Sequence, residues 1–137
     1  MKVMTFSLAD ELYGIDIAAI QEIIEAPQRF FIPAAPEDYQ GAINFHGAVT
    51  PVLDLARLLG LAEAPFDERV IVLNSNICIL ALAIHDLRSI VTVVDNELLP
   101  CDEQRGQDFC IQNILNHDNQ MINILELSKL LSRLDRL

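Results

Sequence analysis

Residues 41–54 read Gly-Ala-Ile-Asn-Phe-His-Gly-Ala-Val-Thr-Pro-Val-Leu-Asp. Two mainly apolar runs, 41–45 and 48–53, flank the dipeptide His46-Gly47. Because glycine accepts the positive φ that two-residue turns require, this stretch predicts an antiparallel β-hairpin. Pro51 cannot donate a hydrogen bond to a neighbouring strand, so its strand lies at a sheet edge or is bulged there.

Short strands and tight turns continue on both sides of this hairpin. Further strands are expected at 3–8, 12–17, 22–26, 30–32, 69–73, 77–84, 90–99, 109–115 and 120–125. A helical turn is expected at 18–21, a short helix at 55–59 between the N-cap Asp54 and Gly60, a polar loop at 101–108 and an amphipathic helix at 126–134. About ten short strands with frequent turns and little helix are typical of small β-barrels.

The sequence therefore predicts an all-β fold in one domain over residues 1–137. A linker at 62–67 separates two half-chains, 1–61 and 68–125, and each half has the length of a small barrel. No tandem repeat relates the two halves, so they are expected to be separate subdomains followed by the C-terminal helix.

The composition limits the partners that this protein can have. Hydrophobic residues make up 52% of the chain and its mean hydropathy is +0.32, which is typical of a folded core. With 20 acidic and 9 basic residues the net charge is −11, and this field repels nucleic acid and anionic membranes. The longest apolar run, 77–84, is too short to enter a bilayer as a spanning segment. The expected partner is another protein.

The cysteines and the N-terminus indicate a cytoplasmic protein. The three cysteines, at 78, 101 and 110, are odd in number and form no Cys-x-x-Cys motif, so a disulfide framework is not expected. The first six residues lack the sustained apolar segment of a secretion signal.

No residue pattern predicts catalysis, a metal or a cofactor. His46, His85 and His117 are isolated from one another, and a nucleophilic pair of Cys110 with His117 is disfavoured because Cys110 falls within an expected strand. Phosphate-binding and dinucleotide-binding glycine motifs are absent. The alternative to a protein-binding module is a barrel that binds a small molecule through polar groups such as His85, Asp86 and Arg88.

The isoleucines between residues 17 and 24 indicate where a partner protein binds. If this segment is partly extended, Ile17, Ile20, Ile23 and Ile24 cannot all face one barrel interior. Some of them are then exposed, and an apolar cluster on an acidic surface marks a protein-binding site. The alternative is a fully helical segment that packs inward.

Two segments resemble the CheW-like domain family. The first is 6–17 followed by Ile-Gln-Glu-Ile at 20–23; the second runs from Ile32-Pro33 through 41–55 to Leu59-Gly60-Leu61, and the C-terminal half agrees more loosely. The resemblance implies two five-stranded SH3-like barrels that share a core, with a C-terminal helix. It also implies a non-catalytic adaptor that couples the cytoplasmic tips of chemoreceptors to the regulatory domain of a CheA-type histidine kinase, without nucleic acid or membrane insertion.

The resemblance also implies two sets of contact residues. The receptor-binding set is Met4, Ile17, Ile20, Ile23 and Leu87, and the kinase-binding set is Glu22, Asn44, His46 and Gly47. An apolar stripe on a receptor helix would fit the first set.

The chain departs from the family pattern at two places. The family has Arg-Gly where this chain has His46-Gly47, and its Gly-x-x-Val-Asp reads Ala-Leu-Ala-Ile-His at 81–85. A histidine opposite Glu22 would make a pH-sensitive pair in place of a permanently charged one. These differences suggest a divergent copy in a separate signalling array, for example one that controls surface motility.

Overall fold

The computed structural model describes residues 1–134. Its strands are β1 (Lys2–Leu8), β2 (Glu11–Asp16), β3 (Ile20–Glu25), β4 (Tyr39–Phe45), β5 (Ala48–Asp54), β6 (Arg69–Leu73), β7 (Ala81–Ala83), β8 (Asp86–Thr92), β9 (Leu98–Pro100), β10 (Ile111–His117) and β11 (Gln120–Leu125). Its helices are α1 (Leu55–Leu58), α2 (Glu103–Asp108) and α3 (Leu127–Leu134), with 3-10 turns η1 (Ile17–Ala19) and η2 (Asp95–Glu97).

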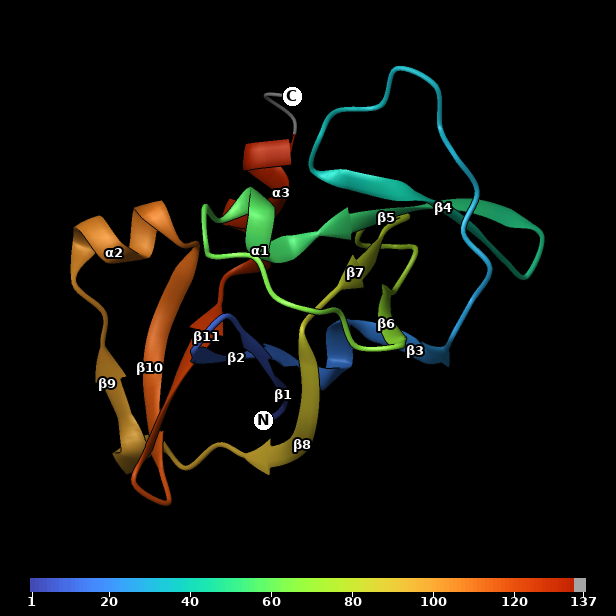
Figure 1. The fold of residues 1–137 in the computed structure, drawn as a ribbon. Helices are drawn as coiled ribbons and strands as arrows, with labels where there is room; N and C mark the ends of the chain where they lie inside the picture. Colours follow the sequence, from blue (N-terminus) through green and yellow to red (C-terminus); the bar gives the residue numbers. More distant parts are fainter. Residues whose placement is uncertain (135–137) are drawn as a thin grey trace.

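The strands form two sheets. One has six strands in the order β8-β1-β2-β11-β10-β9, and the other has five in the order β3-β6-β7-β5-β4. Most neighbours are antiparallel, but β2 pairs with β11 and β5 pairs with β7 in parallel. Figure 1 shows the six-stranded sheet with α2 on one side of the molecule, the five-stranded sheet on the other, and α3 between them at the top.

Three apolar clusters explain why the sheets curl into barrels. One cluster is built from all five strands of the smaller sheet and includes Ile43, Val52 and Val72; a second draws on all six strands of the larger sheet and includes Val3, Leu115 and Ile122. The largest cluster joins residues of both sheets with α1 and α3. Two small barrels that share a core are thus confirmed, although one of them has six strands instead of the expected five.

The division between the sheets does not follow the predicted boundary at residues 62–67. The six-stranded sheet combines β1 and β2 with β8 to β11, and the five-stranded sheet combines β3 to β5 with β6 and β7. Each half of the chain therefore contributes to both barrels. The sequence hides this because the parallel pairing of β2 with β11 joins residues about a hundred positions apart, and no local pattern signals such a contact.

Local predictions are confirmed where they rest on a turn glycine, a helix-capping residue or an amphipathic pattern. The hairpin around His46-Gly47 forms, with Phe45 opposite Ala48, and the Asp54 side chain caps α1 by accepting a hydrogen bond from the Arg57 amide at 3.1 Å. The C-terminal helix forms as α3, with Leu130 fully buried in the shared core.

Four local predictions are wrong. The strand expected at 30–32 does not form, and Phe30 makes only an isolated bridge to Ala42. Residues 101–108 contain α2, because Asp102 caps a segment without apolar periodicity by accepting from the Gln104 amide at 2.9 Å. The strand expected at 77–84 shrinks to β7, because the amides of Ile77 and Cys78 turn back to the carbonyl of Asn74. The strand expected at 90–99 is replaced by β8, which begins at Asp86, then by η2 and the short β9.

Candidate partner-binding surfaces

The turn between β4 and β5 places three predicted kinase-binding residues together. His46 and Gly47 have φ values of +49° and +84°, and the Gly47 amide donates to the Asn44 side-chain oxygen at 2.9 Å. Asn44 therefore braces the turn from its own strand. The Asn-Phe-His-Gly sequence builds this tip locally, with glycine at a position where a left-handed backbone is required.

The turn between β4 and β5 also contacts β3, which is the strand at the other edge of the five-stranded sheet. His46 Nε2 lies 3.6 Å from a carboxylate oxygen of Glu22, and the two side chains are 74% and 51% exposed. The imidazole packs edge-on against the Phe45 ring with 4.3 Å between ring centroids. Because both side chains are largely exposed, solvent screens this pair and it holds the turn only weakly.

A cavity of about 300 Å³ opens beside this turn. Its lining is Gln21, Phe45, His46, Ala48, Thr50, Val72, Leu73, Ser75, Ile79 and Leu80. Small-molecule pockets usually span about 300–1,000 Å³, so this one is at the lower limit and has room for little more than a large side chain. Ile79, on its rim, is 55% exposed.

Three of the five predicted receptor-binding residues pack against the shared core. Ile20 and Ile23 reach it from β3, and Leu87 reaches it from β8; both strands are sheet edges. Met4 is buried in β1, where its neighbours in register are Ile15 and Ile90. Ile17 is half-buried in η1.

The isoleucine cluster expected to be exposed is instead half-buried. Ile20 and Ile23 pack against the shared core, whereas Ile24 packs against the cluster inside the five-stranded barrel. The segment is a 3-10 turn followed by an edge strand, so alternate side chains point to the two faces of the sheet. The fully helical alternative is also wrong.

Other apolar residues are more exposed than these isoleucines, and no sequence pattern marks them. Phe31 is 86% exposed and Val49 is 76% exposed. Both lie within apolar runs, where a buried and an exposed residue look alike. Val49 faces Asn44 across the hairpin, beside the predicted kinase-binding residues.

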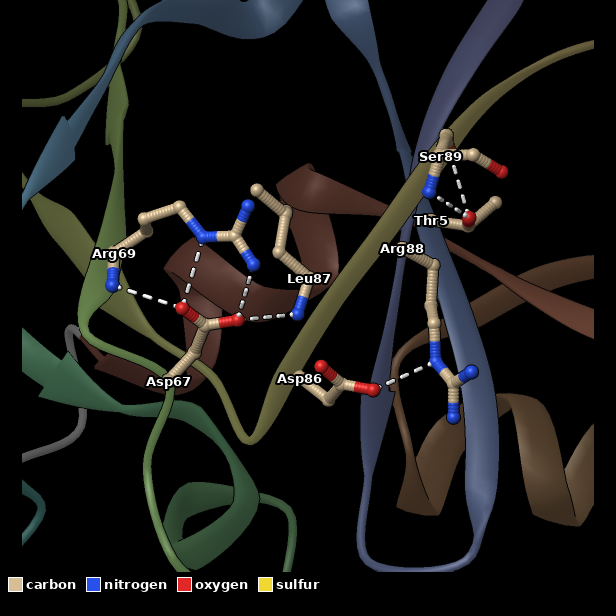
Figure 2. Close-up of polar contacts among 7 residues, drawn as sticks. All are labelled: Thr5, Asp67, Arg69, Asp86, Leu87, Arg88 and Ser89. Atoms are coloured by element: carbon tan, nitrogen blue, oxygen red, sulfur yellow. Dashed lines mark hydrogen bonds and ion pairs between the residues drawn. The ribbon is translucent and has the colours of Figure 1, made fainter.

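A buried carboxylate fixes the position of Leu87 (Figure 2). One oxygen of Asp67 accepts from the Arg69 amide at 2.9 Å and from Arg69 Nε at 3.0 Å; the other accepts from Arg69 Nη2 at 3.0 Å and from the Leu87 amide at 2.7 Å. The Asp67 side chain is only 7% exposed. The side-chain hydrogen bonds from Arg69, helped by the two backbone amides, lower the pKa of Asp67 to about 2. No motif or spacing in the sequence singles out this residue.

Figure 2 also shows how β8 is held against β1. The register between these strands shifts between Met4 and Phe6, and the Thr5 hydroxyl fills the irregularity by donating to the Ser89 carbonyl at 2.7 Å. The Ser89 amide donates back to the same hydroxyl oxygen at 3.1 Å. Edge strand β8 is therefore anchored at two points.

The polar groups suggested for a small-molecule site do not converge. Asp86 and Arg88 pair with each other at 2.9 Å, whereas His85 Nδ1 accepts from the Ala9 amide at 2.8 Å. His85 lines a cavity of about 640 Å³ together with Phe66 and Arg57, but Asp86 and Arg88 do not line it. The small-molecule alternative is therefore not better supported than partner binding.

Cys110 and His117, which were considered as a nucleophilic pair, have other neighbours in the structure. Burial raises the pKa of the Cys110 thiol, and His117 faces Glu97 and Asp118. No three His, Cys, Asp or Glu side chains within residues 1–134 are placed to hold a metal ion. Among the same residues, no helix has the length and apolar character needed to cross a membrane.

The structure thus combines two barrels that share a core with candidate contact residues on β1, β3, β4 and β8, in η1 and in the turn between β4 and β5. Residues 2–135 match the family model for the CheW-like domain. A probable chemotaxis protein CheW from Rhizobium etli is 28% identical over 136 residues, which cover 96% of this chain and 87% of that protein. The chemotaxis protein CheW of Bacillus subtilis is 24% identical over 136 residues, which also cover 96% of this chain and 87% of that protein. The crystal structure of the scaffolding protein TtCheW from Thermoanaerobacter tengcongensis superimposes with a TM-score of 0.77 at 26% identity, covering 91% of this chain and 88% of that one.

The chain therefore belongs to the CheW-like domain family. It is an adaptor of chemotaxis-type signal transduction, as its relatives and its structural neighbour indicate.

Proposed function

We propose that this chain couples chemoreceptor tips to the regulatory domain of a CheA-type histidine kinase in the bacterial cytoplasm, without catalysing a reaction itself. An adaptor of this kind raises the effective concentration of one partner beside the other and biases the kinase toward one conformation. Its contribution lies in the placement of surfaces, and no reactive group is needed.

The observation that best supports the kinase contact is the meeting of Glu22 with His46. These residues come from separate elements, and the family resemblance independently implies that both contact the kinase. Asn44 and Gly47 belong to the same turn and are joined by a hydrogen bond. A single partner surface can therefore contact all four residues on the five-stranded barrel.

The support for the receptor contact is that Ile20, Ile23 and Leu87 are all half-buried against the shared core. An apolar stripe on a receptor helix would cover side chains that are now only half-buried. These residues come from different barrels, so the receptor surface depends on how the two barrels sit against each other.

Co-sedimentation with the kinase regulatory domain and with a receptor-tip fragment from the same organism tests the proposal. Ile20→Asp should abolish receptor binding, because a charge in an apolar contact is costly to desolvate, and circular dichroism checks that the variant is folded. Met121→Asp is the control, since Met121 is 49% exposed on β11, a strand that carries none of the proposed contact residues. Normal receptor binding by the folded Ile20→Asp variant would contradict the assignment.

A further inference from the structure

The chain passes from the five-stranded sheet to the six-stranded sheet through Ile84 and His85, between β7 and β8. We call residues 84–87 the crossover. The barrels are also joined by the shared core and by η1 between β2 and β3, so the crossover decides a narrower question, namely where the edge strand β8 begins. A flexible crossover would let the start of β8 shift relative to β3, whereas a pinned one would hold Leu87 in a fixed position. The hydrogen bonds around these four residues indicate a pinned crossover.

On the side of the five-stranded barrel, Asp67 holds both ends of the crossover. Its backbone amide donates to the Ile84 carbonyl at 2.9 Å, and its carboxylate accepts from the Leu87 amide at 2.7 Å. The carboxylate is itself oriented by two parallel bonds from the Arg69 guanidinium, and Arg69 is the first residue of β6. Because such a charge-assisted bidentate pair has a fixed geometry, Asp67 holds the Leu87 amide in a fixed position relative to β6.

On the side of the six-stranded barrel, His85 makes the equivalent connection. Its amide donates to the Ser7 carbonyl at 3.2 Å, and its Nδ1 accepts from the Ala9 amide at 2.8 Å. Ser7 lies in β1 and Ala9 in the turn that follows, so these bonds fix the crossover to the first hairpin of the larger sheet. The crossover is therefore tied to one barrel through Asp67 and to the other through His85.

We propose that Asp67 is a positioning residue, which sets the receptor-binding surface by pinning the crossover between the two barrels. The inference rests on the proposed function, because it uses the assigned receptor contacts. Those contacts come from both barrels, Ile20 and Ile23 from β3 and Leu87 from β8. The assigned kinase contacts all come from the five-stranded barrel. Releasing the crossover should therefore disturb receptor binding and spare kinase binding.

The test is the affinity of the Asp67→Asn variant for each partner, measured separately. The amide keeps the shape of the carboxylate but removes its charge and one acceptor, so the bonds from Arg69 and Leu87 cannot all be kept. Affinity for the receptor-tip fragment should fall about tenfold, while affinity for the kinase regulatory domain stays within about twofold of the wild type. Asp86→Asn is the matched control: it makes the same change one residue from Leu87, at a side chain that is 51% exposed and bonds to Arg88 alone in Figure 2.

The two affinities separate positioning from simple stability, because partial unfolding would weaken both. Equal loss of both affinities, or no loss of receptor affinity, would overturn the inference. If Asp67→Asn does not fold, Arg69→Gln is used in its place. This change removes the guanidinium that orients the Asp67 carboxylate but leaves the Leu87 amide its acceptor. The same selective loss of receptor affinity is expected, and its absence counts against the inference. If the wild-type protein binds neither partner, the proposed function fails instead.

Discussion

Replacing Asp67 by asparagine should destabilise the protein by an amount that depends on pH. The pKa of this carboxyl is about 2 in the folded protein, against an ordinary value of 3.8. A difference of nearly two pKa units corresponds to about 2 kcal/mol of stabilisation of the folded state by the ionised carboxylate. The side chain is 7% exposed, so solvent screens this interaction little.

The direction of this pH dependence follows from the linkage between protonation and folding. Because folding lowers the pKa of Asp67, its stabilisation is fully present above the unfolded value of 3.8 and is lost as pH falls through about 2. Asp67→Asn should therefore be less stable than the wild type by about 2 kcal/mol at pH 6, and this difference should shrink by about 1 kcal/mol at pH 3.

Urea unfolding of both proteins across this pH range, followed by circular dichroism, measures the effect. Subtracting one protein's free energy of unfolding from the other removes the contribution of the other carboxyl groups. Asp86→Asn is the control, since its half-exposed pair with Arg88 should contribute less than about 1 kcal/mol at any pH. A difference between wild type and Asp67→Asn that is the same at pH 6 and pH 3 would refute the reasoning about ionisation, even if the variant were destabilised.

Two further predictions concern the five-stranded barrel. The affinity for the kinase regulatory domain should fall a few-fold in His46→Ala, because the His46 side chain is 74% exposed at the proposed kinase contact and the partner would lose it; unchanged affinity would remove His46 from that contact. Gly41→Ala should lower the free energy of unfolding by at least about 2 kcal/mol, because φ is +132° and the added Cβ would lie 2.4 Å from the Phe30 carbonyl oxygen. Gly60→Ala, at φ +73° in open space, should cost about 1 kcal/mol, and equal thermal denaturation of the two variants would show that the contact with Phe30 is unimportant.

The hairpin around His46-Gly47 and the Asp54 cap show what local sequence can predict. Both depend on neighbours within a few residues: a glycine at positive φ and a carboxylate over the first turn of a helix. Helix α2 is equally local, through Asp102, but a short helix without an apolar stripe resembles a polar loop in sequence.

The candidate site was predictable in part. The family resemblance names Glu22 and His46 together, and the structure places them 3.6 Å apart. The residues themselves predict an exposed isoleucine cluster, which is half-buried instead, because periodicity does not reveal which face of an edge strand a second barrel covers. Asp67 carries no sequence signal, since its role depends on Leu87, twenty positions away.

By itself the sequence determined the class of the fold, the positions of its turns and caps, and a surface charge that disfavours phosphate-rich partners. These properties depend on composition and on contacts between residues close together in the chain. Only the tertiary structure decided that each half of the chain enters both barrels, and that Asp67 and His85 pin the crossover between them. The physical reason is that parallel pairing and buried polar contacts join residues with no local relation, so they exist only once the chain has folded.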